Sequence, residues 1–172
     1  MNKALLSALA CFIPVAARAG LTSITIANPG FQADSFGGVG YASQNGNVVT
    51  GWNLTNPGGM GVTGTDQPGG AHFIDGVTVD GNRAGFIQGT GTYSQNIGGL
   101  VNGKRYVLQG WFRPRNCCGD SPVFSADYNC QSLIPNQLLT AGSPWQGMSV
   151  PFTAGSSSGS LSFSSFTQLG GD

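Results

Sequence analysis

The 172 residues are enough for one domain with a substantial core, and 29 of them are glycine while only 8% are charged. The formal net charge is zero, which gives no electrostatic basis for binding nucleic acid or an anionic membrane. All seven acidic residues are aspartate and His72 is the one histidine, so the chain has few groups for acid–base catalysis.

The first residues have the pattern of a secretory signal peptide. Lys3 precedes an apolar run that ends at Ala17, and Ala17-Arg18-Ala19 is an A-x-A cleavage pattern. We therefore predict a signal peptide over residues 1–19 and a secreted domain over residues 20–172, located outside the cell, in a periplasm or on a cell surface.

The alternative to cleavage is an N-terminal membrane anchor. Pro14 and Arg18 leave too short an apolar span for that, so we expect no membrane insertion after cleavage. Cleavage removes two of the seven basic residues, Lys3 and Arg18, and leaves a mildly acidic domain.

Short strands separated by turns are expected along the whole mature chain. In the first half, alternating Ile24 and Ile26 indicate a strand over 23–27, a second short strand carries Trp52, and residues 56–70 read as a long turn-rich tract. Further short apolar pieces and strands are predicted at 72–74, 77–79, 84–88 and 92–97.

The second half of the chain is more regular. Its predicted strands cover residues 105–113, 123–128, 131–139 and 145–153, followed by a last strand with Leu161, Phe163 and Phe166. Pro135 argues for an edge position of the strand that contains it. Close-spaced strands with almost no helical periodicity predict an all-β fold, an antiparallel β-sandwich of jelly-roll type.

The strand from Arg105 to Phe112 is the candidate for a binding site. Its alternation places Tyr106, Leu108 and Phe112 on a core face and polar or aromatic side chains on the other. Aromatic rings stack on sugar C–H groups and planar polar groups bind hydroxyls. If strands 105–113 and 123–128 are neighbours, the ligand-binding residues are Gln109, Trp111, Arg113, Asp127 and Tyr128.

A purely structural interpretation of the same residues is the competing hypothesis. In it, Trp111 packs under a loop and Arg113 forms an ordinary ion pair with Asp120 or Asp127. Trp52 and Trp145 each lie in a short apolar segment, so we expect both in the core.

Three cysteines remain after cleavage, an odd number for an oxidising compartment. A disulfide from Cys118, or from Cys117, to Cys130 would clip a hairpin and leave one thiol over. The alternatives are a vicinal bridge between Cys117 and Cys118, a crosslink to a second chain, or a metal site, although the chain has no C-x-x-C spacing.

Several motifs, taken in order, carry a family resemblance. They are Asn28-Pro29-Gly30-Phe31-Gln32, Gly51-Trp52, the 92–97 strand followed by Gly103-Lys104-Arg105-Tyr106-Val107-Leu108, and the late run from Trp145 to Ala154. The mature chain resembles secreted carbohydrate-binding modules of the galactose-binding-domain-like superfamily, found in bacterial exported and plant cell-wall proteins. The resemblance implies a jelly roll that binds a glycan.

The resemblance also implies a structural calcium ion near Gln32 and Asp172. Related modules have Glu at the position of Gln32, and they end in a closing strand with an Asp pair just after the position of Asp172. Here the charge at Gln32 is missing, although hard cations prefer several anionic oxygens. Either residues 161–169 close the sandwich, or an open sheet edge awaits a strand from another copy or from sequence beyond these residues.

The expected function is therefore a non-catalytic module that binds a glycan or polysaccharide. The chain has no Ser/His/Asp spacing and no glutamate pair for glycoside hydrolysis, so we predict no enzyme activity. The alternative is a structural matrix, surface or fibre subunit that self-associates through an open edge or an unpaired cysteine.

Overall fold

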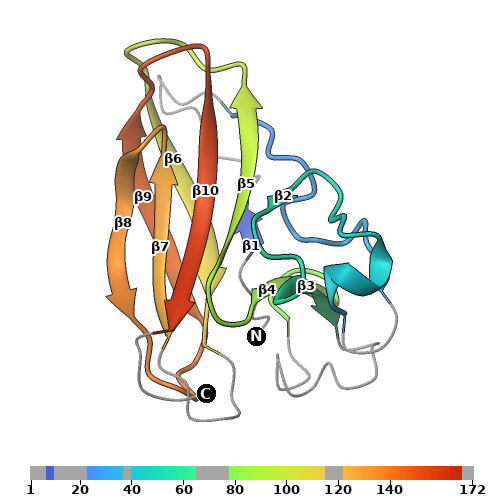
Figure 1. Cartoon of the computed structure of the whole chain (residues 1–172). Coiled ribbons are helices and arrows are strands. Elements are labelled where there is room, and N and C mark those ends of the chain that lie inside the picture. Colours follow the sequence, from blue (N-terminus) through green and yellow to red (C-terminus); the bar gives the residue numbers. More distant parts are fainter. Residues whose placement is uncertain (1–6, 10–22, 37–39, 65–77, 115–121, 168–172) are drawn as a thin grey trace.

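The computed structural model describes residues 7–9, 23–36, 40–64, 78–114 and 122–167. Within these residues the chain forms ten strands and one short 3-10 helix, η1 (Figure 1). The elements are β1 (Ser7–Leu9), η1 (Ala42–Asn45), β2 (Asn53–Leu54), β3 (Met60–Gly64), β4 (Arg83–Ile87), β5 (Gly91–Gly98), β6 (Arg105–Phe112), β7 (Pro122–Tyr128), β8 (Gln131–Leu138), β9 (Gln146–Thr153) and β10 (Ser158–Thr167). None of the described helical segments is long or apolar enough to cross a bilayer.

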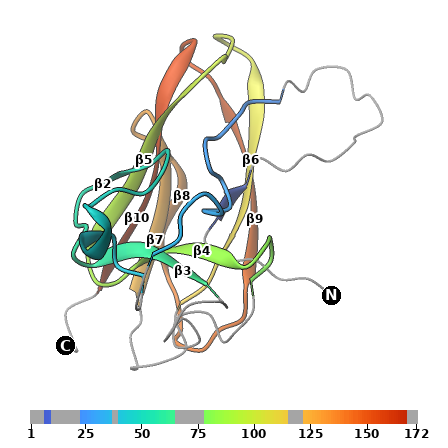
Figure 2. The ribbon, with the colours of Figure 1, turned by 90° about the vertical axis from the view of Figure 1, so that its right-hand side faces the viewer.

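The last six strands, β5 to β10, pair as a nested set of antiparallel strands, which is the arrangement of a jelly roll. β5 pairs with β10, β6 with β9 and β7 with β8, and the roll closes where β10 also pairs with β7. The result is a five-stranded sheet in the order β2-β5-β10-β7-β8 against a three-stranded sheet in the order β1-β6-β9. Figure 2 shows the two layers from the side. The predicted antiparallel β-sandwich of jelly-roll type is confirmed.

Aromatic side chains from both sheets fill the space between the layers. Phe112 of β6 stacks on Phe124 of β7 with ring centroids 4.5 Å apart, and Tyr128 of β7 lies 4.8 Å from Phe152 of β9. The period-two alternation of β6 places Tyr106, Leu108 and Phe112 inside, as the sequence predicts. Burying large rings from facing sheets is the main stabilising term.

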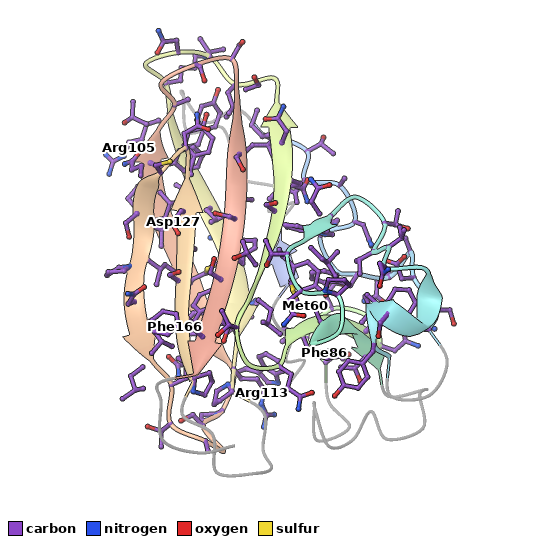
Figure 3. The ribbon with its side chains drawn as sticks, viewed as in Figure 1. Met60, Phe86, Arg105, Arg113, Asp127 and Phe166 are labelled. Atoms are coloured by element: carbon purple, nitrogen blue, oxygen red, sulfur yellow. The ribbon has the colours of Figure 1, made fainter. Side chains whose placement is uncertain are left out.

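A small third sheet, β3-β4, extends the molecule on one side, beside η1 (Figure 1). Met60 of β3 is fully buried and Phe86 of β4 is largely buried, and Figure 3 shows both side chains in this part of the molecule. Phe31 stacks on Trp52 at 5.5 Å, and Trp52 lies 5.8 Å from Phe163 of β10. One continuous core therefore joins the small sheet to the sandwich, and Trp52 is a core residue as predicted.

Two local predictions are wrong. Residues 23–27 form no strand; instead the Gln95 side chain accepts a hydrogen bond from the Ala27 N–H at 2.9 Å and donates to the Ala27 carbonyl at 3.2 Å. The Gln95 side chain thus satisfies the backbone N–H and C=O of Ala27, which a neighbouring strand would otherwise do. The tract 56–70, read as loop, contains β3, whose glycines hide its strand character from a propensity argument. Residues 72–74, and 77 of the piece 77–79, lie outside the described residues.

The last strand occupies a central position. β10 lies between β5 and β7 with hydrogen bonds on both sides, so residues of the last strand close the sandwich, and the alternative of an open edge at this strand does not hold. Among the described strands β8, which contains Pro135, pairs with β7 alone, which confirms its edge position.

β1 lies within the residues predicted to be the signal peptide. Its three residues pair antiparallel with Gln109, Gly110 and Trp111 at the edge of β6. The boundary between signal and domain stays a prediction.

Candidate functional site

The outward side chains of β6 and β9 form a flat strip, called here the β6–β9 outer face. The register pairs Trp111 with Gly147 at one end and Arg105 with Thr153 at the other. The full set is Arg105, Val107, Gln109 and Trp111 from β6 and Gly147, Ser149, Pro151 and Thr153 from β9. All but the half-buried Gln109 are exposed. Apart from Arg105 the face carries no charge.

Trp111 lies at one end of this face, packed against Gly147 of β9. A Cβ added to Gly147, directly across the ladder, would come within 2.9–3.2 Å of three carbons of the Trp111 six-membered ring. The indole therefore rests on the Gly147 backbone, and 37% of the Trp111 residue remains exposed. Glycine at position 147 is what permits this seat, because any side chain there would push the ring outward.

Polar groups adjoin the ring along the strip. Gln109 is two residues from Trp111 on the same face, and its Nε2 donates a long hydrogen bond of 3.4 Å to Ser149 Oγ on β9. Such a bond between solvent-accessible groups is weak and is readily exchanged for a ligand hydroxyl. The face thus combines an aromatic plane with an amide and a hydroxyl, and it continues over apolar Val107 and Pro151.

The structure brings together only part of the predicted ligand site. The premise that strands 105–113 and 123–128 are neighbours is wrong, because β6 belongs to the three-stranded sheet and β7 to the five-stranded sheet. Tyr128 is 2% exposed and points into the core, whereas Asp127, half-buried, is on the opposite side of β7 (Figure 3). Gln109 and Trp111 share the β6–β9 outer face; Asp127 and Tyr128 are not part of it.

Arg113 lies just beyond β6, at the opposite end of the strand from Arg105 (Figure 3). Its guanidinium carbon is 5.1 Å from the centre of the Trp145 ring, a cation–π distance, and its Nε donates to the Pro114 carbonyl at 3.1 Å. Trp145 is half-buried and not fully in the core as predicted. Asp120, one suggested ion-pair partner of Arg113, lies outside the described residues.

Cys130 is exposed at the turn between β7 and β8, and its thiol forms no disulfide within the residues that the structure describes. Cys117 and Cys118 lie outside the described residues, so the disulfide to Cys130 stays a prediction. The seven residues of β7, about 20 Å of extended chain, separate Cys130 from the segment before Pro122.

Gln32 and Asp172 were the residues expected near a calcium ion. Asp172 lies outside the described residues, and Gln32 Nε2 is a donor to backbone carbonyls. Among the described residues no three His, Cys, Asp or Glu side chains come together as a metal cluster.

Asp34 is the buried carboxylate of the described chain. It accepts hydrogen bonds from Asn28 Nδ2 at 2.8 Å, from Thr50 Oγ1 at 2.8 Å and from the Thr50 N–H at 3.1 Å. These bonds tie the 28–34 segment to the approach of β2. With its oxygens engaged in this way, Asp34 has a structural role.

Gly147 and Ser149 are the site residues that the sequence argument missed. Alternation along 145–153 places them on one face with Pro151, but their use depends on which strand lies beside them. A small residue directly opposite an exposed tryptophan is recognisable only once the β6–β9 register is known.

Comparison with known proteins places the chain in a family. The model of the HpiC1-like family, described as HpiC1 cyclase, matches residues 22–110, which is 89 of the 172 residues. The chain therefore belongs to the HpiC1-like family. The matched region runs from the segment before Phe31 through most of β6, so it includes Trp52 and Gln109 but ends one residue before Trp111.

No curated protein matches the chain. Among solved structures, a protein described as "EclA C-terminal domain; sugar-binding protein" aligns over 44% of this chain at 19% identity, with a TM-score of 0.38. The chain spans about half of that protein's length, 54%.

Proposed function

We propose that the chain is a secreted, non-catalytic module that binds a neutral carbohydrate on the β6–β9 outer face. The observation that carries the proposal is the exposed Trp111 ring packed against Gly147, with Gln109 and Ser149 beside it. A flat aromatic ring stacks on the C–H face of a pyranose, and the adjacent amide and hydroxyl exchange hydrogen bonds with its hydroxyl groups.

The charge of the face supports a neutral ligand. Arg105 is its one charged group and lies at the end farthest from Trp111. The continuous strip from Trp111 to Val107 and Pro151 runs along the strands, which suits an extended chain of sugar units better than a single deep-bound monosaccharide.

The aspartates that the structure describes lie away from the proposed binding face. Asp34, Asp80 and Asp127 are the aspartates that the structure describes, and none of them lies on the β6–β9 outer face. Glycoside hydrolysis needs a pair of carboxyl groups flanking the bond that breaks.

Replacing Trp111 tests the proposal. Trp111→Ala is expected to weaken binding to neutral polysaccharides about tenfold or more, because the central aromatic contact of an interface dominates its affinity. Affinity electrophoresis and a glycan array measure the loss. Trp111→Phe, which keeps a flat ring, is expected to retain part of the binding.

Two further variants make the test specific. Gly147→Val keeps the tryptophan at position 111 but displaces its ring from Gly147. We expect this variant to bind more weakly than wild type. Asp127→Asn, on the other sheet, is the matched control and is expected to bind like wild type. Wild-type protein that binds no neutral glycan would refute the proposal, and equal binding by Trp111→Ala would refute its location.

The family match favours a second candidate, an enzyme that closes a ring, since the family model is described as a cyclase. This candidate predicts that a small molecule able to close a ring, and no polysaccharide, protects the protein against thermal unfolding. Trp111→Ala would then leave that protection unchanged.

A further inference from the structure

The side-chain amide of Gln32 faces a cage of backbone carbonyls. Its Nε2 lies 2.6 Å from the Gly30 oxygen, 3.0 Å from the Asp80 oxygen and 3.2 Å from the Arg83 oxygen. The cage joins the segment before β2 to the start of β4, about fifty residues away along the chain. Gln32 is exposed, so ions in solution have access to the cage.

The numbers of hydrogen-bond donors and acceptors in the cage explain why the Gln32 amide nitrogen faces the carbonyls. Carbonyl oxygens only accept, so three that converge need either N–H groups or a cation at their centre. The Gln32 nitrogen supplies two hydrogens for three carbonyls, while its Oε1 accepts from the Asn82 N–H at 3.3 Å. The nitrogen thus takes the position in which a positive charge would be most favourable.

Two glycines shape the cage around this side chain. A Cβ at Gly81, whose φ is +67°, would lie 2.5 Å from Gln32 Oε1, and a Cβ at Gly30 would lie 2.9 Å from Asp80 Oδ2. The backbone therefore closes tightly on both the Gln32 amide and the Asp80 carboxylate. The Asp80 carboxylate thus lies against Gly30, whose carbonyl is one of the three in the cage.

The residues present do not fit the calcium ion that the family resemblance implies. Calcium takes six to eight oxygen ligands, several of them anionic. Here the atom that faces the carbonyls is an amide nitrogen, which is no ligand for a hard cation, and Asp80 is the carboxylate that adjoins the cage.

We propose that the Gln32 amide replaces a cation in this cage, so that the fold is independent of calcium. A carboxylate at position 32 would reverse the situation: it cannot donate to the carbonyls, and together with Asp80 and the three carbonyl oxygens it would form a calcium site. Gln32→Glu is thus expected to create calcium dependence by one exchange of NH₂ for oxygen.

Thermal unfolding of the full chain tests this proposal. Wild type is expected to have the same Tm in EGTA and in millimolar CaCl₂. Gln32→Glu is expected to unfold about 2–5 °C lower than wild type in EGTA, because the cage loses its donor, and to recover in CaCl₂ but not in MgCl₂. Isothermal titration is expected to detect calcium binding to Gln32→Glu alone.

Two controls separate a calcium site from a general effect. Gln32→Ala is expected to lower the Tm equally in EGTA and in CaCl₂, and Asp80→Asn added to Gln32→Glu is expected to abolish the recovery. A calcium-induced rise in the wild-type Tm would overturn the proposal, as would a Gln32→Glu protein indifferent to calcium. Neither readout depends on carbohydrate binding.

Discussion

Two buried tyrosines in one core differ in what their hydroxyl groups contact. Tyr93 of β5 is fully buried and its Oη donates to the Gly61 carbonyl of β3 at 2.6 Å. Tyr128 of β7 is as deeply buried, but within the described part of the chain its Oη has no hydrogen-bond partner. A buried hydroxyl is stabilising in the first case and carries a desolvation cost in the second.

Removing each hydroxyl is therefore expected to shift stability in opposite directions. Tyr128→Phe should raise the free energy of unfolding by about 1 kcal/mol, and Tyr93→Phe should lower it by about 1–2 kcal/mol. Urea unfolding curves of the two variants give both values. A loss of stability in Tyr128→Phe would show that its hydroxyl has a partner.

The same burial makes stability sensitive to high pH. Desolvation raises the pKa of Tyr93 far above its ordinary value, partly offset by the hydrogen bond to Gly61. Above pH ~10 the unfolded chain releases this proton while the folded chain keeps it, so stability is full below that pH and falls as pH rises. Urea unfolding between pH 9 and about 11 is expected to show a steeper decline for wild type than for Tyr93→Phe.

At the scale of elements, the β7–β8 turn is a two-residue hairpin with an unusual residue. Asn129 and Cys130 both have positive φ, 46° and 62°, as a type I′ turn requires. Asn129 suits its position, and its Oδ1 accepts from the Ser160 N–H of β10 at 2.8 Å. Cys130 occupies the position that glycine favours, where a Cβ costs about 1 kcal/mol.

Cys130→Gly distinguishes a free thiol from a disulfide. With the thiol free, the substitution is expected to raise the free energy of unfolding by about 0.5–1 kcal/mol, because the turn loses its strain. Were Cys130 bridged to Cys117 or Cys118, the loss of the disulfide would instead lower stability by about 2–4 kcal/mol. Mass spectrometry under non-reducing conditions is the independent measurement.

The same variant addresses self-association. An intermolecular bridge through the exposed Cys130 would produce a dimer under non-reducing conditions that Cys130→Gly abolishes. If wild type and Cys130→Gly are both monomeric, self-association does not occur through a Cys130 disulfide, and this support for a matrix, surface or fibre subunit is lost.

At the scale of the whole molecule, the sandwich consists of the strands from β5 onward, with the two-residue β2 added at the edge of one sheet and the three-residue β1 at the edge of the other. A chain that starts at Gly20 is expected to have a Tm within about 2 °C of the full chain, because an edge pairing of this length contributes little cooperative stability. Differential scanning calorimetry measures the difference.

N-terminal sequencing of the exported protein is expected to begin at Gly20; a product that retains Ser7 would contradict cleavage.

At the candidate site, the alternation of side chains within one strand predicts which residues share a face, but not which strands are neighbours. The period-two alternation of Arg105 to Phe112 was sufficient to place Gln109 and Trp111 together on an outward face. It could not show that Asp127 lies on the other sheet, because sheet membership is set by pairing between strands distant in sequence. Gly147 and Ser149 were missed for the same reason, since their partners on β6 lie about forty residues away.

The sequence by itself determined the all-β class, most strand positions from β4 onward and the inward face of β6, because these depend on side-chain alternation and turn residues within a few positions. Only the tertiary structure decided that β10 lies between β5 and β7, that the Trp111 ring rests on Gly147, and that the Gln32 amide faces three carbonyls. Each of these depends on atoms distant in the chain, and their approach is settled by how the jelly roll packs as a whole.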